Sequence, residues 1–114
     1  MMKHIDNNGR RSRAVVANGT VYMGGQVADD WTADVATQTR QALARIDAIL
    51  AEAGSDRSKV VSAQIWLKTM DDYEAMNAVW DAWVDPAGAP ARSCGVVEMA
   101  HEGLRVEIIP TAIL

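Results

Sequence analysis

The chain has 114 residues, with 11 Lys and Arg against 15 Asp and Glu, so its formal net charge at pH 7 is −4. This length predicts a single domain, residues 1–114, that can fold around an ordinary core without disulfides or a structural metal. The acidic balance argues against nucleic-acid binding, because that binding depends on Lys and Arg that neutralise phosphates.

Few residues suit metal binding or disulfide formation. The one cysteine, Cys94, has no partner for an intramolecular disulfide, and the two histidines, His4 and His101, lie at opposite ends of the sequence. A zinc site is therefore not expected. The N-terminus lacks the apolar segment of a signal peptide, and no apolar run approaches the ~18 residues of a membrane span. We expect a cytoplasmic protein with no membrane partner.

The first element predicted along the chain is a β-hairpin. Two β-prone runs, Arg13–Ala17 and Thr20–Met23, are joined by Asn18-Gly19, the pair that most readily adopts the positive φ angles of a type I′ turn. Gly24-Gly25 follows the second run. The missing side chains would let a ligand or another backbone approach closely, although a glycine pair that merely ends a strand explains them equally well.

Two amphipathic helices are predicted. Between Asp34 and Ala53 apolar residues recur at steps of three and four, and Gly54 follows as a natural C-terminal cap. A second helix is predicted near Asp72–Val84, where acidic residues suit the helix N-terminus. The apolar residues of this helix have helical spacing, which indicates packing in the core rather than a cofactor site. They are Tyr73, Met76, Val79, Trp80 and Trp83.

Three further strands are predicted, over Lys59–Lys68, Ala91–Glu98 and Leu104–Ile109. The order is then β-β-α-β-α-β-β, an α+β fold with a mixed sheet and both helices on one face. Two helices cover only one face of such a sheet, yet several strands have apolar side chains on both faces. We therefore expect the uncovered face to be buried against further copies of the chain, most simply in a closed ring.

The last two predicted strands carry the residues most suggestive of chemistry. Side chains alternate along a strand, so Arg92 and Cys94 share one face, while Arg105, Glu107 and Ile109 share a face of theirs. A cation, a thiol and a carboxylate could then converge. Arginine offers a carboxylate a planar two-point contact, and Glu107 could orient or deprotonate a water. These groups describe a pocket for a small carboxylate that undergoes addition of water.

Each of these residues also has a purely structural explanation. Arg92 could form a surface or interface salt bridge, Cys94 could fill a small apolar site, and Glu107 could be solvated on the polar side of a strand. Motifs for hydrolase triads and nucleotide-binding loops are absent.

Several segments, in matching order and spacing, resemble the Rid family of reactive intermediate deaminases, also called YjgF-like and formerly L-PSP endoribonucleases. The similarity extends from about Arg13 to the C-terminus. The resemblance implies a chorismate-mutase-like fold, a homotrimer and ligand clefts between neighbouring subunits. The matching segments are Gly25-Gln26, Gln38-Thr39, Ala42-Leu43, Ile49–Gly54, Met76-Asn77, Pro90–Cys94 and Val106–Ile108.

The resemblance also implies an activity, the hydrolysis of 2-imino acids to 2-keto acids and ammonia, with no cofactor and no metal. Arg92 matches the arginine that binds the substrate carboxylate, and Glu107 matches the glutamate that positions the attacking water. Cys94 matches a family cysteine with a packing and main-chain role. Gly25 and Asn77 match positions that line the cleft.

The chain departs from the deaminase pattern at two positions of this expected cleft. Arg11 stands where a tyrosine is usual, and Gly24 stands where a serine is usual. Both changes enlarge the cleft. If Arg11 points inward, its charge favours a bulkier or doubly acidic imine; if it points to solvent, the cleft is only roomier.

We therefore predict an imine deaminase with a small carboxylate-bearing substrate, although nothing in the sequence specifies an imine over another small carboxylate. The alternative is a non-catalytic trimer that binds small carboxylates or a partner protein, with Arg92 as the anchor. Ribonuclease activity, suggested by the older family name, is not expected. The chain is acidic, and its two histidines do not form a motif for acid–base cleavage.

Overall fold

A computed structural model describes residues 1–114 of the chain. Its main elements are six strands and two helices. The helices are α1 (Val35–Ala53) and α2 (Tyr73–Trp83), and short 3-10 turns, Arg57–Lys59 and Met70–Asp72, precede β4 and α2. The strands are β1 (Lys3–Ile5), β2 (Ala14–Ala17), β3 (Thr20–Met23), β4 (Val60–Leu67), β5 (Ala91–Val96) and β6 (Val106–Ile113).

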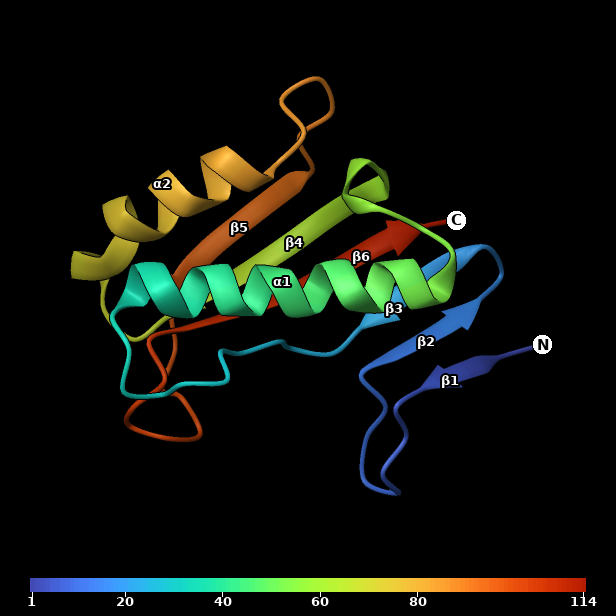
Figure 1. The fold of residues 1–114 in the computed structure, drawn as a ribbon, viewed down its shortest axis with the longest axis horizontal. Coiled ribbons are helices and arrows are strands. Elements are labelled where there is room, and N and C mark those ends of the chain that lie inside the picture. Colours follow the sequence, from blue (N-terminus) through green and yellow to red (C-terminus); the bar gives the residue numbers. More distant parts are fainter.

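All six strands form one sheet, in the order β1-β2-β3-β6-β4-β5, and both helices lie on the same face of it (Figure 1). Only β4 and β5 run parallel, and every other neighbouring pair is antiparallel. The α+β class and the mixed sheet with one helix-covered face are confirmed.

Helix α1 begins and ends at the signals that its sequence carries. The Asp34 side chain accepts a hydrogen bond of 2.8 Å from the backbone N–H of Thr37, which satisfies one free donor of the first turn. Gly54 adopts a φ of 86°, and its N–H donates to the carbonyl of Ala51. A left-handed residue here closes the helix without the steric cost of a Cβ. Both predicted ends of the helix are confirmed.

The two helices pack on the sheet over a core cluster of 20 buried residues. Helix α2 contributes Met76, Trp80 and Trp83, while Tyr73 and Val79 pack against the cluster. The prediction that this face of α2 lies in the core is confirmed. Neither helix is both long and apolar enough to span a membrane.

The opposite face of the sheet has no helix against it (Figure 1). The strand registers place Val15, Tyr22, Trp66 and Ile109 on this open face. Tyr22, in the second strand of the hairpin, is 52% exposed. Apolar side chains are therefore present on the open face, as the sequence predicts, together with the polar side chains of Gln64 and Thr111.

Strand β1 is absent from the prediction. Its three residues, Lys3–Ile5, are too few and too polar to give an alternating pattern, and they become a strand by pairing with β2. Strand β5 ends at Val96 rather than at Glu98.

Strand β6 also differs, because it begins at Val106 and continues through Pro110 to Ile113. The sequence predicts an end before Pro110, which has no N–H for a sheet. The proline is accommodated by a bulge in the neighbouring chain segment: Tyr22 pairs with Thr111, but Gln26 pairs with Ile108, which leaves one extra residue after β3. The extra residue lies at Gly24-Gly25, beside the candidate site.

Candidate functional site

Arg92 is held by aromatic rings rather than by a carboxylate. It pairs with buried Ala63 of β4, so its side chain lies on the helix-covered face. Its guanidinium carbon lies 5.5 Å from the ring centroid of Trp80 and 6.0 Å from that of Tyr73. One Nη donates a 3.4 Å hydrogen bond to the Tyr73 hydroxyl, and none of the ion pairs in the chain involves Arg92. Ring faces hold the cation without using its donors, so most of its N–H groups remain free for a ligand carboxylate.

Asn77 lies on the same side of α2 as these rings, since it follows Tyr73 by one turn and precedes Trp80 by one turn. Its Oδ1 is buried and has no hydrogen-bond partner. A buried acceptor without a donor costs free energy unless something else supplies the donor. A ligand N–H is a group that could do so.

Cys94 shares the face of Arg92, as alternation predicts, and is partly buried. Burial raises the pKa of its thiol, and the charge of Arg92 opposes this only in part. A thiol with a raised pKa stays protonated at neutral pH and is a poor nucleophile. We call Arg92, Tyr73, Asn77, Trp80 and Cys94 the arginine half-site.

Glu107 lies on the other face of the sheet, directly against Gly25. It pairs with Trp66 on β4, and a Cβ built on Gly25 would lie 1.8 Å from its Oε2. Only glycine leaves room for the carboxylate at this point of the bulge. Burial raises the pKa of Glu107, and no ion pair involves this residue. We call Glu107 and Gly25 the glutamate half-site.

Replacing Gly25 with alanine should displace this carboxylate without breaking a hydrogen bond. If Glu107 handles the attacking water, kcat should fall by about a hundredfold, because a misplacement of 1 Å at a reacting centre has effects of that order. The measurement is kcat for the imine hydrolysis that the sequence resemblance implies, together with the thermal unfolding midpoint. Gly24→Ala is the matched comparison, since a Cβ there meets nothing closer than 3.7 Å. Equal losses of kcat in both variants would contradict this role of Gly25.

Arg11 and Gly24 lie beside the glutamate half-site, around a cavity of about 220 Å³ that Gly25 also lines. The Arg11 Nη1 donates a 2.6 Å hydrogen bond to the carbonyl of Asp6 and lies 3.5 Å from its carboxylate. Arg11 therefore lines the cavity with a side chain that is 44% exposed and is held by Asp6. Gly24 does not have a positive φ, and a Cβ there would make ordinary van der Waals contact with the Ser12 carbonyl oxygen at 3.7 Å, so no steric reason requires glycine there.

One sequence-based placement is wrong within one chain, and a neighbouring arginine has a structural role. The Arg105 guanidinium donates hydrogen bonds of 2.8 and 2.6 Å to Asp72, whose carboxylate is almost fully buried at the start of α2. Arg92 and Glu107 do not face each other. Their partners on β4, Ala63 and Trp66, are an odd number of residues apart, so the two side chains lie on opposite faces of the sheet.

Sequence reasoning missed the contribution of Tyr73 and Trp80, which it placed in the core alone. Their spacing puts both rings on one side of α2, but only the packing of β5 against that side shows that they flank Arg92. It also missed Asp6, whose position beside Arg11 depends on the unpredicted strand β1 and the turn after it.

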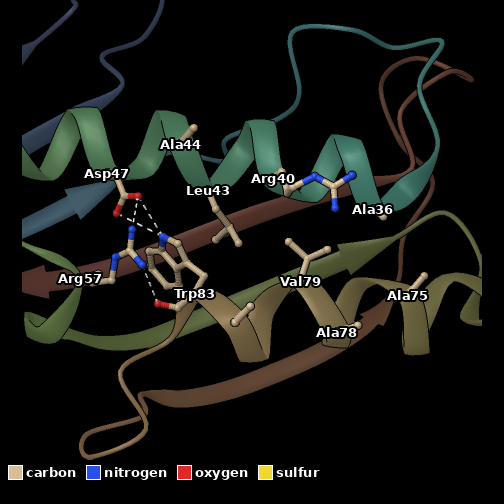
Figure 2. A pocket seen from close by; sticks show the side chains of 11 residues that line it. Ala36, Arg40, Leu43, Ala44, Asp47, Arg57, Ala75, Ala78, Val79 and Trp83 are labelled. Atoms are coloured by element: carbon tan, nitrogen blue, oxygen red, sulfur yellow. Dashed lines mark hydrogen bonds and ion pairs between the residues drawn. The ribbon is translucent and has the colours of Figure 1, made fainter.

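The largest cavity, about 600 Å³, lies elsewhere, between α1 and α2 (Figure 2). It is lined mainly by alanines together with Leu43 and Val79. At one end Asp47 accepts hydrogen bonds from Arg57, at 2.7 Å, and from the Trp83 Nε1, at 3.1 Å. These polar groups satisfy one another, and no residue of either half-site lines the groove. No group of three or more potential metal ligands occurs in the structure.

Comparison with known proteins places the chain in a family. A family model described as endoribonuclease L-PSP matches residues 1–114. A crystal structure of a YjgF family member from Neisseria meningitidis superposes with a TM-score of 0.96 at 42% identity, covering 99% of this chain and 94% of that one. The chain belongs to the YjgF/Rid family. The resemblance and the fold that it implied are thereby confirmed, and the match extends to the N-terminus, beyond the segment identified from sequence.

Relatives within the Rid family differ in how much their names say. A RutC family protein from Haemophilus ducreyi is 39% identical over 112 residues, which cover 98% of this chain and 96% of that protein. A 2-iminobutanoate/2-iminopropanoate deaminase from Capra hircus is 33% identical over 111 residues, which cover 92% of this chain and 80% of that protein. The Rid family therefore includes a named imine deaminase, whereas RutC names specify no reaction.

Proposed function

We propose that this Rid-family chain hydrolyses 2-imino acids to 2-keto acids and ammonia, in clefts formed between copies of itself. The observation that carries the proposal is the separation of two complementary half-sites. One face of the sheet holds an arginine with free donors, and the other holds a half-buried glutamate without a partner. Neither half-site suffices for the reaction, and a cleft between two chains can combine them.

The open face of the sheet supports such an assembly. Its side chains include Val15, Tyr22, Trp66 and Ile109, which are apolar over much of their surface and lie on the side of Glu107. Burying them against identical faces would remove apolar area from water and bring the glutamate half-site of one copy toward its neighbour. We propose a closed homotrimer, in which each cleft takes the arginine half-site from one chain and the glutamate half-site from the next.

The reaction requires little besides orientation, since an imine carbon is already electrophilic. The fork of Arg92 binds the substrate carboxylate at two points, and the Asn77 Oδ1 accepts a hydrogen bond from the imine N–H. Glu107 removes a proton from water as the water oxygen bonds to the imine carbon, and the imine nitrogen takes up a proton, which gives a carbinolamine. The amino group of the carbinolamine then takes up a second proton, the hydroxyl loses its proton and the C–N bond breaks, which leaves a 2-keto acid and ammonia. A raised pKa makes the ionised Glu107 a stronger base than an exposed glutamate.

The test is a coupled assay in which an amino-acid oxidase releases imines and ammonia formation is followed with and without the protein. The protein should accelerate ammonia release, and light scattering should give about three times 12.3 kDa. Binding of 2-oxobutanoate without acceleration for any imine would indicate the alternative, a non-catalytic carboxylate-binding trimer. Arg11 and Gly24 favour that alternative, because they lack the tyrosine ring and the serine hydroxyl of the deaminase pattern.

Cys94→Ala should retain at least about half of the parent activity, because a protonated, partly buried thiol contributes packing rather than nucleophilic attack. Steady-state kinetics on a small imine check this. Loss of turnover with intact 2-oxobutanoate binding and an unchanged unfolding midpoint would show that the thiol takes part in the chemistry.

A further inference from the structure

We propose that the cavity beside the glutamate half-site is a subsite for a second carboxylate, so that the preferred substrates are imines of dicarboxylic amino acids. This inference rests on the proposed imine hydrolysis and specifies its substrate class. The cavity, which we call the basic subsite, is lined by no hydrophobic residue. Its lining residues are Arg11, Ser12, Arg13, Gly24, Gly25 and Gln26.

The charges of the basic subsite are unbalanced. Arg11 and Arg13 share a single carboxylate, that of Asp6, at 3.5 and 2.5 Å. Among the residues that line the cavity of about 220 Å³ and their ion-pair partners, one positive charge is therefore left over, since the nearby Glu107 carboxylate does not line the cavity. An anionic group of the ligand would balance this charge, and a carboxylate suits the planar donors of a guanidinium.

Free hydrogen-bond donors also favour an anionic ligand in the basic subsite. Arg11 uses only Nη1, and Arg13 uses Nε and Nη1, so that each retains an Nη2 without a partner in the chain. The Arg13 donors are held in place, because Gln26 is buried, accepts a hydrogen bond from Arg13 at 3.2 Å and donates one to the carbonyl of Gly24 at 3.1 Å. Donors fixed before the ligand arrives lose little entropy on binding.

The location of the basic subsite relates it to the reacting centre. Gly25 contacts the Glu107 carboxylate and also lines the basic subsite, which Glu107 itself does not line. A substrate whose imine carbon faces Glu107 can then extend its side chain past Gly25 toward Arg11 and Arg13. Gly24 lines the cavity without a side chain, although a Cβ there would make only ordinary contacts, at 3.7 Å and beyond.

A substrate with a short aliphatic side chain fits this wall poorly. Its methyl groups would lie among polar groups with no apolar surface to contact, and the surplus charge would remain unbalanced. A carboxylate at the end of the side chain removes both disadvantages. Discrimination between the two substrates thus resides in the basic subsite, while Arg92 and Glu107 treat both alike.

The experiment compares imines of glutamate and of 2-aminobutyrate, each generated by an oxidase, in the parent, Arg11→Gln, Asp6→Asn and the control Arg10→Gln. Arg10 is exposed and does not line the cavity. The parent should have the higher kcat/KM for the glutamate imine. Arg11→Gln should lower the ratio of the two kcat/KM values about tenfold, the effect of one charge-assisted contact. Asp6→Asn adds a net positive charge and should raise the ratio, and Arg10→Gln should leave it at the parent value.

A parent preference for the 2-aminobutyrate imine, or a ratio that Arg11→Gln leaves unaltered, would overturn the basic subsite while leaving imine hydrolysis intact. Calorimetry with 2-oxoglutarate and 2-oxobutanoate separates the other case. Tighter binding of 2-oxoglutarate that depends on Arg11, in a protein that accelerates no imine, would support the basic subsite and reject the reaction.

Discussion

Arg92→Ala should abolish binding of 2-oxobutanoate and lower kcat/KM for imines by roughly a thousandfold, because two charge-assisted hydrogen bonds of about 2 kcal/mol each are lost. The fold should survive. Arg92 lies on the edge strand β5, takes part in no ion pair, and gives up only its contacts with Tyr73 and Trp80. Calorimetry measures the binding, and the unfolding midpoint confirms that the variant is folded.

Two companion variants separate charge from geometry. Arg92→Lys keeps the charge but loses the planar fork, so it should restore only a small part of the affinity. Tyr73→Phe keeps the ring beside the guanidinium but removes the 3.4 Å hydrogen bond, and should weaken binding about threefold. Arg10→Ala serves as the control for loss of an arginine charge. If Arg92→Ala binds 2-oxobutanoate as tightly as the parent, the carboxylate-binding role is wrong.

Glu107→Gln should lower kcat by roughly a hundredfold to a thousandfold while leaving 2-oxobutanoate binding intact, since removal of a general base affects the transition state rather than the bound carboxylate. The parent rate should fall as pH decreases through the pKa of Glu107, because only the ionised form accepts a proton. Burial raises this pKa, so the fall should begin at a higher pH than for an ordinary glutamate. A pH–rate profile of parent and variant measures both effects.

The same pKa shift predicts how Glu107 affects stability. A carboxyl group whose pKa is raised by folding binds its proton more tightly in the folded state, so its contribution to the unfolding free energy is lost as pH rises through the folded pKa. Glu107→Gln should therefore be at least as stable as the parent at pH 7. Exposed Glu52 provides the matched control, as Glu52→Gln.

A Glu107→Gln variant with the parent kcat would contradict the catalytic role of Glu107, because the water would then be activated by another group.

Local signals predicted those parts of the fold whose causes are local. Asn18-Gly19 specified the hairpin turn, and Asp34 and Gly54 specified the ends of α1, because each acts on the backbone within a few residues. Strand β1 and the end of β6 depend on distant partners. Pro110 lies in an inner strand, opposite the Gly24-Gly25 bulge, and no residue close to Pro110 in the sequence indicates that bulge.

For the site, too, the predictions that depend on one strand were correct, and those that depend on how strands pair were not. Alternation correctly placed Arg92 and Cys94 on one face, since that depends on β5 alone. The relation of Arg92 to Glu107 depends on the registers of β5 and β6 against β4, and these put the two side chains on opposite faces. The ion pair of Arg105 with Asp72 was not predicted, because the two residues are distant in sequence.

A site shared between two copies of the chain is tested most directly by mixing two inactive variants. Arg92→Ala and Glu107→Gln are unfolded together in equal amounts, refolded and assayed for imine hydrolysis beside each variant refolded alone. In a homotrimer assembled at random, about a quarter of the clefts would combine an intact Arg92 from one chain with an intact Glu107 from its neighbour. We expect the mixture to recover about a quarter of the parent activity. Activity no higher than the average of the two separate variants would contradict a cleft built from both chains.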